Sequence, residues 1–243
     1  MDNFNSKVYF DKSQLFKEDS FIKKLDSLDE SNFSFIYVHI PKNGGTSLRY
    51  KIKKLIDCLI INNTNEIKHK REIININHTL FRHYIYPKKL ICFSREPLSR
   101  CFSMFYYHKL NQRFLNFNEF INKLYNNKKV VEYIQNKDCT DLKMKFDLLR
   151  TPRGTSVAYS WKCQSSWIPD DEIFFLGKLE NSQKDLERLC EKINKPYKFI
   201  DCHANKGNYL PSEKENITQE TKKYIYEIYK QDYIRFNYSI PFD

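Results

Sequence analysis

Glycine is scarce in this chain, and long apolar runs are absent. Only five glycines occur among 243 residues, so a glycine pair marks a place where the backbone needs freedom that a side chain would deny. No stretch approaches the ~18 consecutive apolar residues that a membrane-spanning helix requires. The first segment, Met1–Lys17, is polar and charged, unlike a secretory signal peptide. We therefore expect a soluble protein without a membrane span.

Paired cysteine motifs are also missing. The seven cysteines include no CxxC pair and no short Cys/His grid, which disfavours a zinc site and a disulfide scaffold. We expect mostly reduced, buried thiols in a reducing compartment and no structural metal. Disulfides formed in a secretory lumen are the alternative.

The composition that is present indicates a globular protein with anionic partners. Hydrophobic residues make up 41% and aromatic residues 16%, enough to bury a core. We expect one domain over 1–243, in which 1–33 forms an N-terminal arm or helix. The net charge of +11 favours a nucleotide, a polyanionic glycan, nucleic acid or a membrane surface as partner, although solubility alone would also account for it.

The apolar pattern predicts strands that alternate with helices. Short β-rich runs predict strands at Phe35–Ile40, Glu72–Ile76, Lys89–Ser94 and Ile173–Leu176. Helical stripes predict helices at Leu48–Ile61, from Pro97 to about Leu110, at Asn181–Ile193 and at about Thr218–Asp232. Thr151–Ser160 is expected to be a polar loop. This alternation predicts an α/β fold with a central, mostly parallel sheet flanked by helices.

The first candidate anion site is the turn after the first predicted strand, Lys42-Asn43-Gly44-Gly45-Thr46-Ser47. A glycine turn between a strand and a helix directs backbone N–H groups and the positive helix end at one point, which suits phosphate or sulfate. Thr46 and Ser47 add hydroxyl donors, and Lys42 adds a positive charge. The lysine precedes the glycines, whereas the nucleoside triphosphatase loop places it after them.

The second candidate anion site follows the strand that ends at Ser94. Arg95 is expected at the carboxyl end of that strand, where ligands of open α/β sheets collect. Arg100 and Ser103, spaced i and i+3, share a helix face. Their guanidinium and hydroxyl groups suit a phosphate, although a helix start with surface charges is the plainer interpretation.

These two segments resemble the nucleotide motifs of one family. His39–Leu48 reads HIPKNGGTSL and is similar to the 5′-phosphosulfate loop of sulfotransferases that use PAPS (3′-phosphoadenosine 5′-phosphosulfate), whose usual form is HIPKTGGTSL. Arg95 and Ser103 match the 3′-phosphate motif RDPxxRxxS, with Glu96 in place of Asp. The branch with heparan sulfate 2-O-sulfotransferases is the most similar. The resemblance implies a P-loop-type three-layer sandwich.

The resemblance also implies roles for further residues. Asn77-His78 stands where the family has GHxxF, so His78 is implied as the catalytic base, with His83 as the fallback. Lys206 and Gly207 lie in a segment similar to the loop that closes over the nucleotide. The implied cofactor-binding set is Lys42, Asn43, Gly44, Gly45, Thr46, Ser47, Leu48, Arg95, Ser103, Lys206 and Gly207.

Weaker similarity covers the rest of the chain. Gln164–Ile168 resembles a family segment close to the acceptor. Tyr229–Tyr238 resembles the terminal segment, whose aromatic residues we expect in the core or scaffold. Glu180 and Asp185 are interpreted as helix-cap or helix-face residues rather than as an acid–base pair.

The expected function is transfer of a sulfuryl group from PAPS to a hydroxyl, chiefly of a carbohydrate, with PAP as product and no metal. His78 would remove the hydroxyl proton and Lys42 would stabilise developing charge. Open alternatives are a tyrosine or small-molecule sulfotransferase, an ATP-dependent P-loop kinase and a non-catalytic polyanion-binding module. We expect no nucleic-acid partner and a cytoplasmic location, or the Golgi lumen if the sequence is a fragment. The acceptor and the oligomeric state stay open.

Overall fold

The computed structural model describes residues 35–55, 58–61, 73–77, 89–137, 144–168, 170, 173–200 and 216–242. The chain divides into two compact units. The sheet unit comprises Met1–Ile40, Gly44–Phe93 and Trp167–His203, and the helical unit comprises Pro41–Asn43, Ser94–Ser166 and Ala204–Asp243. The single domain over 1–243 stays a prediction. The predicted arm over 1–33 lies outside the described residues.

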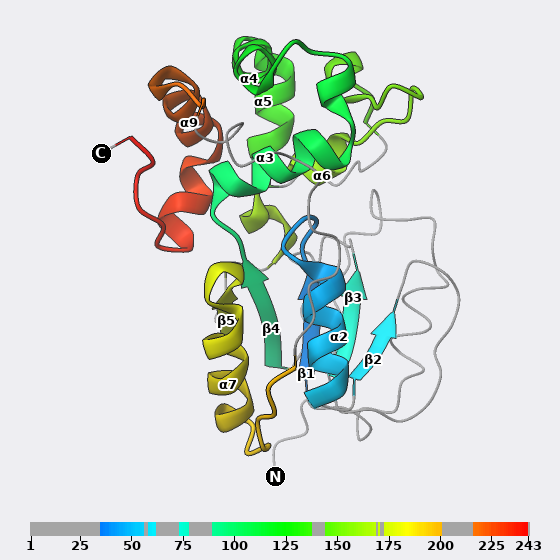
Figure 1. The fold of residues 1–243 in the computed structure, drawn as a ribbon, viewed down its shortest axis with the longest axis vertical. Coiled ribbons are helices and arrows are strands. Elements are labelled where there is room, and N and C mark those ends of the chain that lie inside the picture. The colour runs from blue at the N-terminus through cyan, green and yellow to red at the C-terminus, as the bar shows by residue number, and fades with distance from the viewer. Residues whose placement is uncertain are drawn as a thin grey trace, which may run out of the picture. The chain divides into compact units, whose positions relative to one another are not determined.

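The sheet unit is built on a mainly parallel β-sheet. Its strands are β1 (Phe35–His39), β2 (Cys58–Ile61), β3 (Ile73–Asn77), β4 (Lys89–Ser94) and β5 (Phe175–Lys178). Their order is β2-β3-β1-β4-β5 (Figure 1). The pairs β1–β3, β1–β4 and β2–β3 are parallel. The predicted α/β fold with a parallel sheet is therefore confirmed.

Helices α2 (Gly45–Leu55) and α7 (Ser182–Lys192) contact each other on one face of this sheet (Figure 1). Side chains alternate along a strand, and the residues Tyr37, Ile91, Phe93 and Phe175 form a buried cluster with both helices. The Tyr37 and Phe93 rings meet edge to face at 6.4 Å. On the other face, Val38 of β1 and Leu90 and Cys92 of β4 are buried too, as expected for strands that read as continuous apolar runs.

One helix prediction is wrong in its second half. The helix predicted over Leu48–Ile61 begins earlier, at Gly45, and ends at Leu55, while Cys58–Ile61 forms β2. Short apolar runs fit either a buried helix or a buried strand. Residues 58–61 form a strand because they pair with β3. The β-branched side chains of Ile60 and Ile61 also favour a strand.

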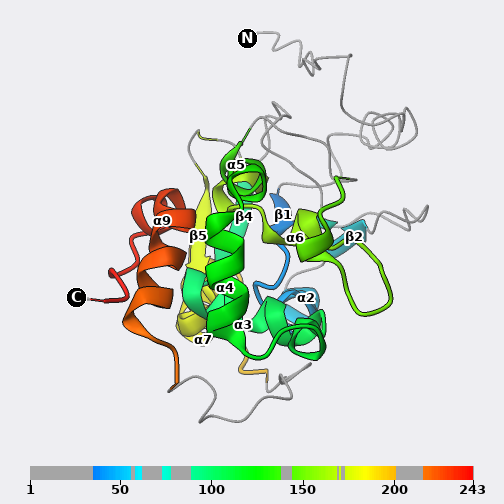
Figure 2. The same cartoon turned by 90° about the horizontal axis from the view of Figure 1, so that it is seen from above.

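In the described part of the helical unit, five helices pack around an aromatic core. They are α3 (Pro97–Tyr107), α4 (Phe117–Asn126), α5 (Lys128–Gln135), α6 (Ala158–Trp161) and α9 (Gln219–Arg235). Helix α9 packs against α3, α4 and α5 (Figure 2). Phe102, Phe105, Phe120, Trp161 and Tyr229 are fully buried between them. The expectation that the terminal aromatic residues belong to the scaffold is confirmed for Tyr229 and Tyr233.

Short 3-10 turns connect these elements. In the helical unit they are η3 (Leu110–Gln112) and η4 (Asp147–Leu149), in the sheet unit η6 (Leu179–Asn181), and η5 (Gln164–Trp167) spans the division.

Asp185 is buried and accepts a hydrogen bond from the backbone N–H of Lys178 at 2.7 Å. This contact is structural, whereas the sequence interpretation expected a helix cap or a solvated helix face.

Glu96 fixes the start of α3. Its carboxylate accepts hydrogen bonds from the backbone N–H groups of Leu98 at 2.9 Å and Ser99 at 2.6 Å, and Pro97 occupies the first helical turn. Both features stabilise a helix N-terminus. The Tyr233 hydroxyl of α9 also donates to Glu96 at 2.8 Å, so the start of α3 is tied to α9.

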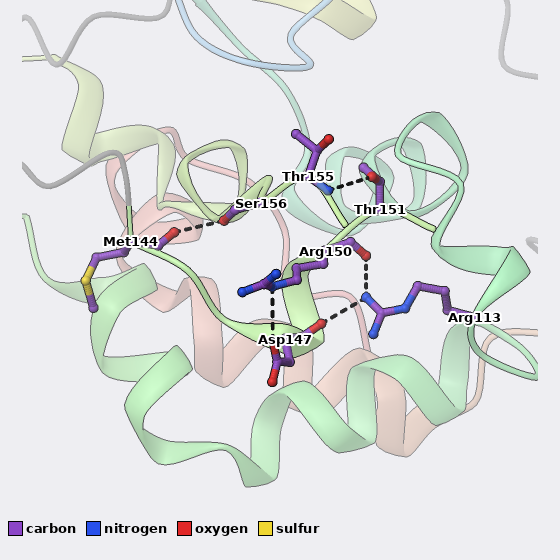
Figure 3. Close-up of polar contacts among 7 residues, drawn as sticks. All are labelled: Arg113, Met144, Asp147, Arg150, Thr151, Thr155 and Ser156. Carbon is purple, nitrogen blue, oxygen red and sulfur yellow. Dashed lines mark hydrogen bonds and ion pairs between the residues drawn. The ribbon is translucent and has the colours of Figure 1, made fainter. Parts of the chain in front are cut away.

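A short hairpin, residues 150–156, interrupts the helices (Figure 3). Arg150 and Ser156 form an antiparallel bridge, and the Thr151 N–H donates to the Thr155 carbonyl at 2.9 Å. Inside it, the Gly154 N–H donates to the Thr151 carbonyl at 2.8 Å. Pro152 and left-handed Gly154, with φ of 79°, suit this turn.

Among the described residues, no helix is long and apolar enough to cross a membrane. Within the same ranges, no group of three or more His, Cys, Asp or Glu side chains could hold a metal ion. Cys101, Cys163 and Cys190 are buried thiols, and burial raises the pKa of Cys101 to about 12. Such thiols stay protonated and unreactive.

Candidate functional site

Lys42 and Arg95, one from each candidate anion motif, lie in contact in the helical unit. The Arg95 Nη1 group donates a hydrogen bond to the Lys42 carbonyl at 3.1 Å, across 53 residues of sequence. Lys42 has a φ of 65°, in the left-handed region that residues other than glycine rarely adopt. The two predicted motifs are thus joined through their first residues.

Gln164 joins the same two segments through a buried side chain. Its Oε1 atom accepts hydrogen bonds from Asn43 Nδ2 at 2.6 Å and from the Arg95 backbone N–H at 2.8 Å. Its Nε2 atom donates to the Arg95 carbonyl at 2.7 Å. Because Gln164 has no exposed surface, these three bonds form without competition from water and fix both segments.

Arg100 supports Pro41, the residue before Lys42. Its guanidinium is buried and donates to three carbonyls: Pro41 at 3.0 Å, Lys162 at 3.0 Å and Ser160 at 2.7 Å. The expectation that Arg100 offers its guanidinium to a ligand beside Ser103 is therefore wrong. A helix-face pattern cannot distinguish an arginine that binds a ligand from one that binds buried backbone.

Asp232 of α9 holds η5 in place through hydrogen bonds. Its carboxylate is fully buried and accepts from the backbone N–H groups of Gln164 at 2.7 Å and Ser165 at 2.9 Å. Burial raises the pKa of Asp232, an effect that these hydrogen bonds and the Arg100 charge oppose. Asp232 therefore fixes Gln164, which in turn holds the segments of Lys42 and Arg95 in place.

The Lys42 ammonium group lies over the ring of Tyr107, with Nζ 3.4 Å from the ring centroid. Burial, and then the positive charge of Arg95, lowers the pKa of Lys42 from 10.5 to about 8. Most of the lysine is still protonated at pH 7, and the aromatic face favours the cation. A second positive charge nearby makes this place attractive to an anion.

The remaining residues of the first motif, from Gly44 onward, belong to the sheet unit. Gly44 has a φ of 68°, and a Cβ atom there would overlap the Leu179 side chain. The Leu48 N–H donates to the Gly44 carbonyl at 2.9 Å, which closes the first turn of α2. Glycine is therefore required at 44 for both backbone conformation and space.

Gly45, Thr46 and Ser47 are the first three residues of α2. Backbone N–H groups at this position have no partner within the helix and carry the positive end of its dipole. They can therefore bind an anion, as the sequence predicts. The Leu48 side chain is buried in the core of the sheet unit, so only its backbone remains near the turn.

The other predicted site residues are less well placed. Ser103 lies about two turns into α3 and is half-buried, and its role toward a 3′-phosphate stays a prediction. His78, the predicted base, its fallback His83, and Lys206 and Gly207 lie outside the described residues.

Sequence reasoning missed two residues of the site. It assigned Gln164 to a segment near the acceptor, but not to the contacts that fix Asn43 and Arg95. It gave Tyr107 no role, although the Lys42 ammonium lies over the ring of this residue. No periodicity or spacing in the sequence indicates either contact.

The chain matches no protein-family model, no curated protein and no solved structure. What the site can do must therefore be inferred from its own residues and from the motifs they form.

Proposed function

We propose that this protein is a PAPS-dependent sulfotransferase that transfers a sulfuryl group to an acceptor hydroxyl, chiefly of a carbohydrate, and releases PAP. The observation that carries the proposal is the contact of Lys42 with Arg95, fixed by Gln164. It brings together the leading residues of two motifs that, in the resembling family, serve opposite ends of one nucleotide. The finer P-loop-type three-layer architecture belongs to the same proposal.

The residues present fit a nucleotide with two separate anionic groups. In the helical unit, Lys42 would contact the 5′-phosphosulfate, and Arg95 with Ser103 would hold the 3′-phosphate. The Arg95 guanidinium donates from Nη1 to the Lys42 carbonyl, and its planar fork is suited to a phosphate. Asn43 holds the loop in place, because its side-chain amide donates a hydrogen bond to the buried Gln164.

Bound PAPS would supply an activated sulfuryl group. Lys42 would stabilise the negative charge that develops as transfer proceeds, because a partly buried cation acts more strongly than one in water. His78 would accept the proton of the acceptor hydroxyl. A sulfuryl group carries less negative charge than a phosphoryl group, so we expect turnover without Mg²⁺.

Calorimetry with PAP tests the proposal directly. Wild-type protein should bind PAP, and Lys42→Met should weaken binding about 10- to 100-fold, the range for loss of a charge-assisted hydrogen bond. Lys129→Met is the matched control, since Lys129 is an exposed residue of α5. Absence of PAP binding to the wild type would refute the proposal.

Turnover separates the proposal from its competitors. Labelled PAPS is incubated with glycans, tyrosine peptides and small alcohols, with and without EDTA, and added sulfate is read by mass. Sulfation that survives EDTA and is lost in His78→Ala supports the assigned chemistry. Binding of ATP in preference to PAP, with dependence on Mg²⁺, would indicate a P-loop kinase instead.

A further inference from the structure

The residues on either side of Arg95 are each held by a tyrosine that is distant in the sequence. Ser94 Oγ and the Tyr238 hydroxyl lie 3.0 Å apart and share a hydrogen bond. The Tyr233 hydroxyl donates to the Glu96 carboxylate at 2.8 Å. These bonds join residues 144 and 137 positions apart, so tertiary packing ties α9 and the segment after it to both neighbours of Arg95.

The backbone of Arg95 is held as well. Gln164 accepts a hydrogen bond from its N–H at 2.8 Å and donates one to its carbonyl at 2.7 Å. With both backbone groups bonded and both neighbouring side chains engaged, the guanidinium extends from a fixed support. A side chain on a preorganised support loses less entropy when it binds a ligand, so these contacts favour binding through Arg95.

The end of α9 brings the two tyrosines together. The Tyr238 N–H donates to the Tyr233 carbonyl at 3.0 Å, and the Asn237 N–H donates to the Ile234 carbonyl at 3.3 Å. Asn237 is left-handed, with a φ of 49°. Two such bonds around a left-handed residue form the Schellman motif that commonly ends a helix. The motif therefore fixes Tyr233 and Tyr238 relative to each other.

Burial protects the two tyrosine bonds. Ser94 and Tyr233 are buried, and Tyr238 is half-buried against the core of the helical unit. A hydrogen bond away from water is stronger than an exposed one. Burial, and then the negative charge of Glu96, raises the pKa of Tyr233, so its hydroxyl stays protonated and donates to the carboxylate at neutral pH.

The start of α3 does not depend on Tyr233. The Glu96 carboxylate also accepts from the backbone N–H groups of Leu98 and Ser99, and these bonds remain when the tyrosine hydroxyl is removed. A Tyr233→Phe protein should therefore keep α3 and lose only the link between α9 and the residue after Arg95.

We propose that Tyr233 and Tyr238 are positioning residues for Arg95, which set the preference of the protein for a nucleotide with a 3′-phosphate over one without it. This inference rests on the proposed function, in which Arg95 binds that phosphate. The tyrosines act through Arg95, because their hydroxyls are bonded to Glu96 and Ser94.

A matched pair of nucleotides tests this role. PAP (3′-phosphoadenosine 5′-phosphate) and AMP (adenosine 5′-phosphate) differ only in the 3′-phosphate. Calorimetry should show that the wild-type protein binds PAP more tightly than AMP. Tyr233→Phe and Tyr238→Phe should each weaken PAP binding about two- to tenfold, the range for one hydrogen bond, and leave AMP binding unchanged. A tyrosine that only stabilised the fold would change both affinities together or neither.

Tyr224→Phe provides the matched control. It removes a tyrosine hydroxyl that donates to Glu220 at 2.6 Å in an exposed part of the same helix. Neither the PAP affinity nor the AMP affinity should change. Urea unfolding of every variant checks that a loss of PAP affinity is not a loss of folded protein.

Ser94→Ala removes the Tyr238 bond from its other end. This variant should weaken PAP binding to about the same extent as Tyr238→Phe. The double variant should lose no more than either single variant, because the Ser94–Tyr238 bond is absent in all three. Losses that add in the double variant would contradict the role of this bond.

The outcomes keep the two proposals apart. A wild-type protein that binds PAP no better than AMP would refute both, because Arg95 would then have no 3′-phosphate to hold. A wild-type preference for PAP that both tyrosine variants retain, or an equal loss of PAP and AMP affinity, would overturn the positioning role and leave the sulfotransferase proposal standing.

Discussion

Lys42 differs from an ordinary surface lysine in both its backbone and its side chain. Its φ is positive, its ammonium lies over the Tyr107 ring, and its backbone carbonyl accepts a hydrogen bond from Arg95. Strained backbone and perturbed ionisation tend to occur together at functional sites. The combination singles out Lys42 among the many lysines of the chain.

The lowered pKa of Lys42 predicts a pH dependence of nucleotide binding. With a pKa of about 8, Lys42 is mainly charged at pH 7 and mainly neutral at pH 9. PAP affinity should therefore fall across this interval, measured by calorimetry at constant ionic strength. Lys42→Arg keeps its charge and should show a much smaller fall; equal falls in both proteins would contradict the assignment.

The lowered pKa of Lys42 has the opposite effect on folding stability, which should increase with pH. Between about pH 8 and the ordinary lysine pKa of about 10.4, the unfolded chain holds a proton that folded Lys42 has released. The free energy of unfolding contributed by this residue should rise with pH over that window. Without ligand, Lys42→Met should have a higher midpoint of urea unfolding at pH 7, and its advantage should shrink toward pH 10.

At the scale of elements, the site depends on contacts that tie loops to helices. Gln164 in η5 binds both the Lys42–Asn43 segment and Arg95, while Asp232 in α9 holds η5. None of these side chains needs to touch a ligand. Their effect on function passes through the position of Lys42 and Arg95.

Gln164→Ala should destabilise the helical unit by roughly 2–3 kcal/mol, because it removes the three buried hydrogen bonds that Gln164 makes with Asn43 and Arg95. PAP affinity should fall as well. Gln183→Ala, at an exposed position on α7, should change neither quantity. Urea unfolding and calorimetry measure both effects, and a Gln164→Ala protein with normal stability would argue against the bridging role.

Gly154 in the hairpin allows the cost of backbone strain to be measured without any steric overlap. Gly154 has a φ of 79°, and a Cβ atom there would meet nothing within 4 Å. Gly154→Ala should therefore lower the free energy of unfolding by about 1 kcal/mol from conformation alone, measured by urea unfolding. Gly154→Asn tolerates this conformation better and should lose less. Alanine and asparagine variants of equal stability would contradict the assignment of strain to this position.

Across the whole molecule, the net charge of +11 adds an attraction that salt screens. Raising NaCl from about 0.05 to about 0.5 M should weaken binding of a long acidic polysaccharide by orders of magnitude. PAP binding, which involves fewer charges, should weaken with a smaller slope, and turnover should persist at saturating substrate. Steep salt dependence without turnover at any concentration would identify a polyanion-binding module.

Much of the architecture followed from local patterns in the sequence. The apolar β-rich runs predicted β1 and β4, because strands buried on both faces are continuously apolar, and the isoleucine-rich run predicted β3. The Gly44-Gly45 pair predicted a turn with unusual backbone, and Gly44 has the positive φ that such a turn needs. Pro97 predicted the start of α3.

Tertiary structure alone decided which polar groups meet. Residues 58–61 became a strand because β3 offered a partner, and Arg100 turned inward because three carbonyls face it. The Gln164–Asn43 bond joins residues 121 positions apart, and the 150–156 hairpin shares a cavity with α3. Periodicity and turn chemistry report only on neighbours along the chain, so the sequence determined the candidate ligand residues while the packing of distant segments determined their arrangement.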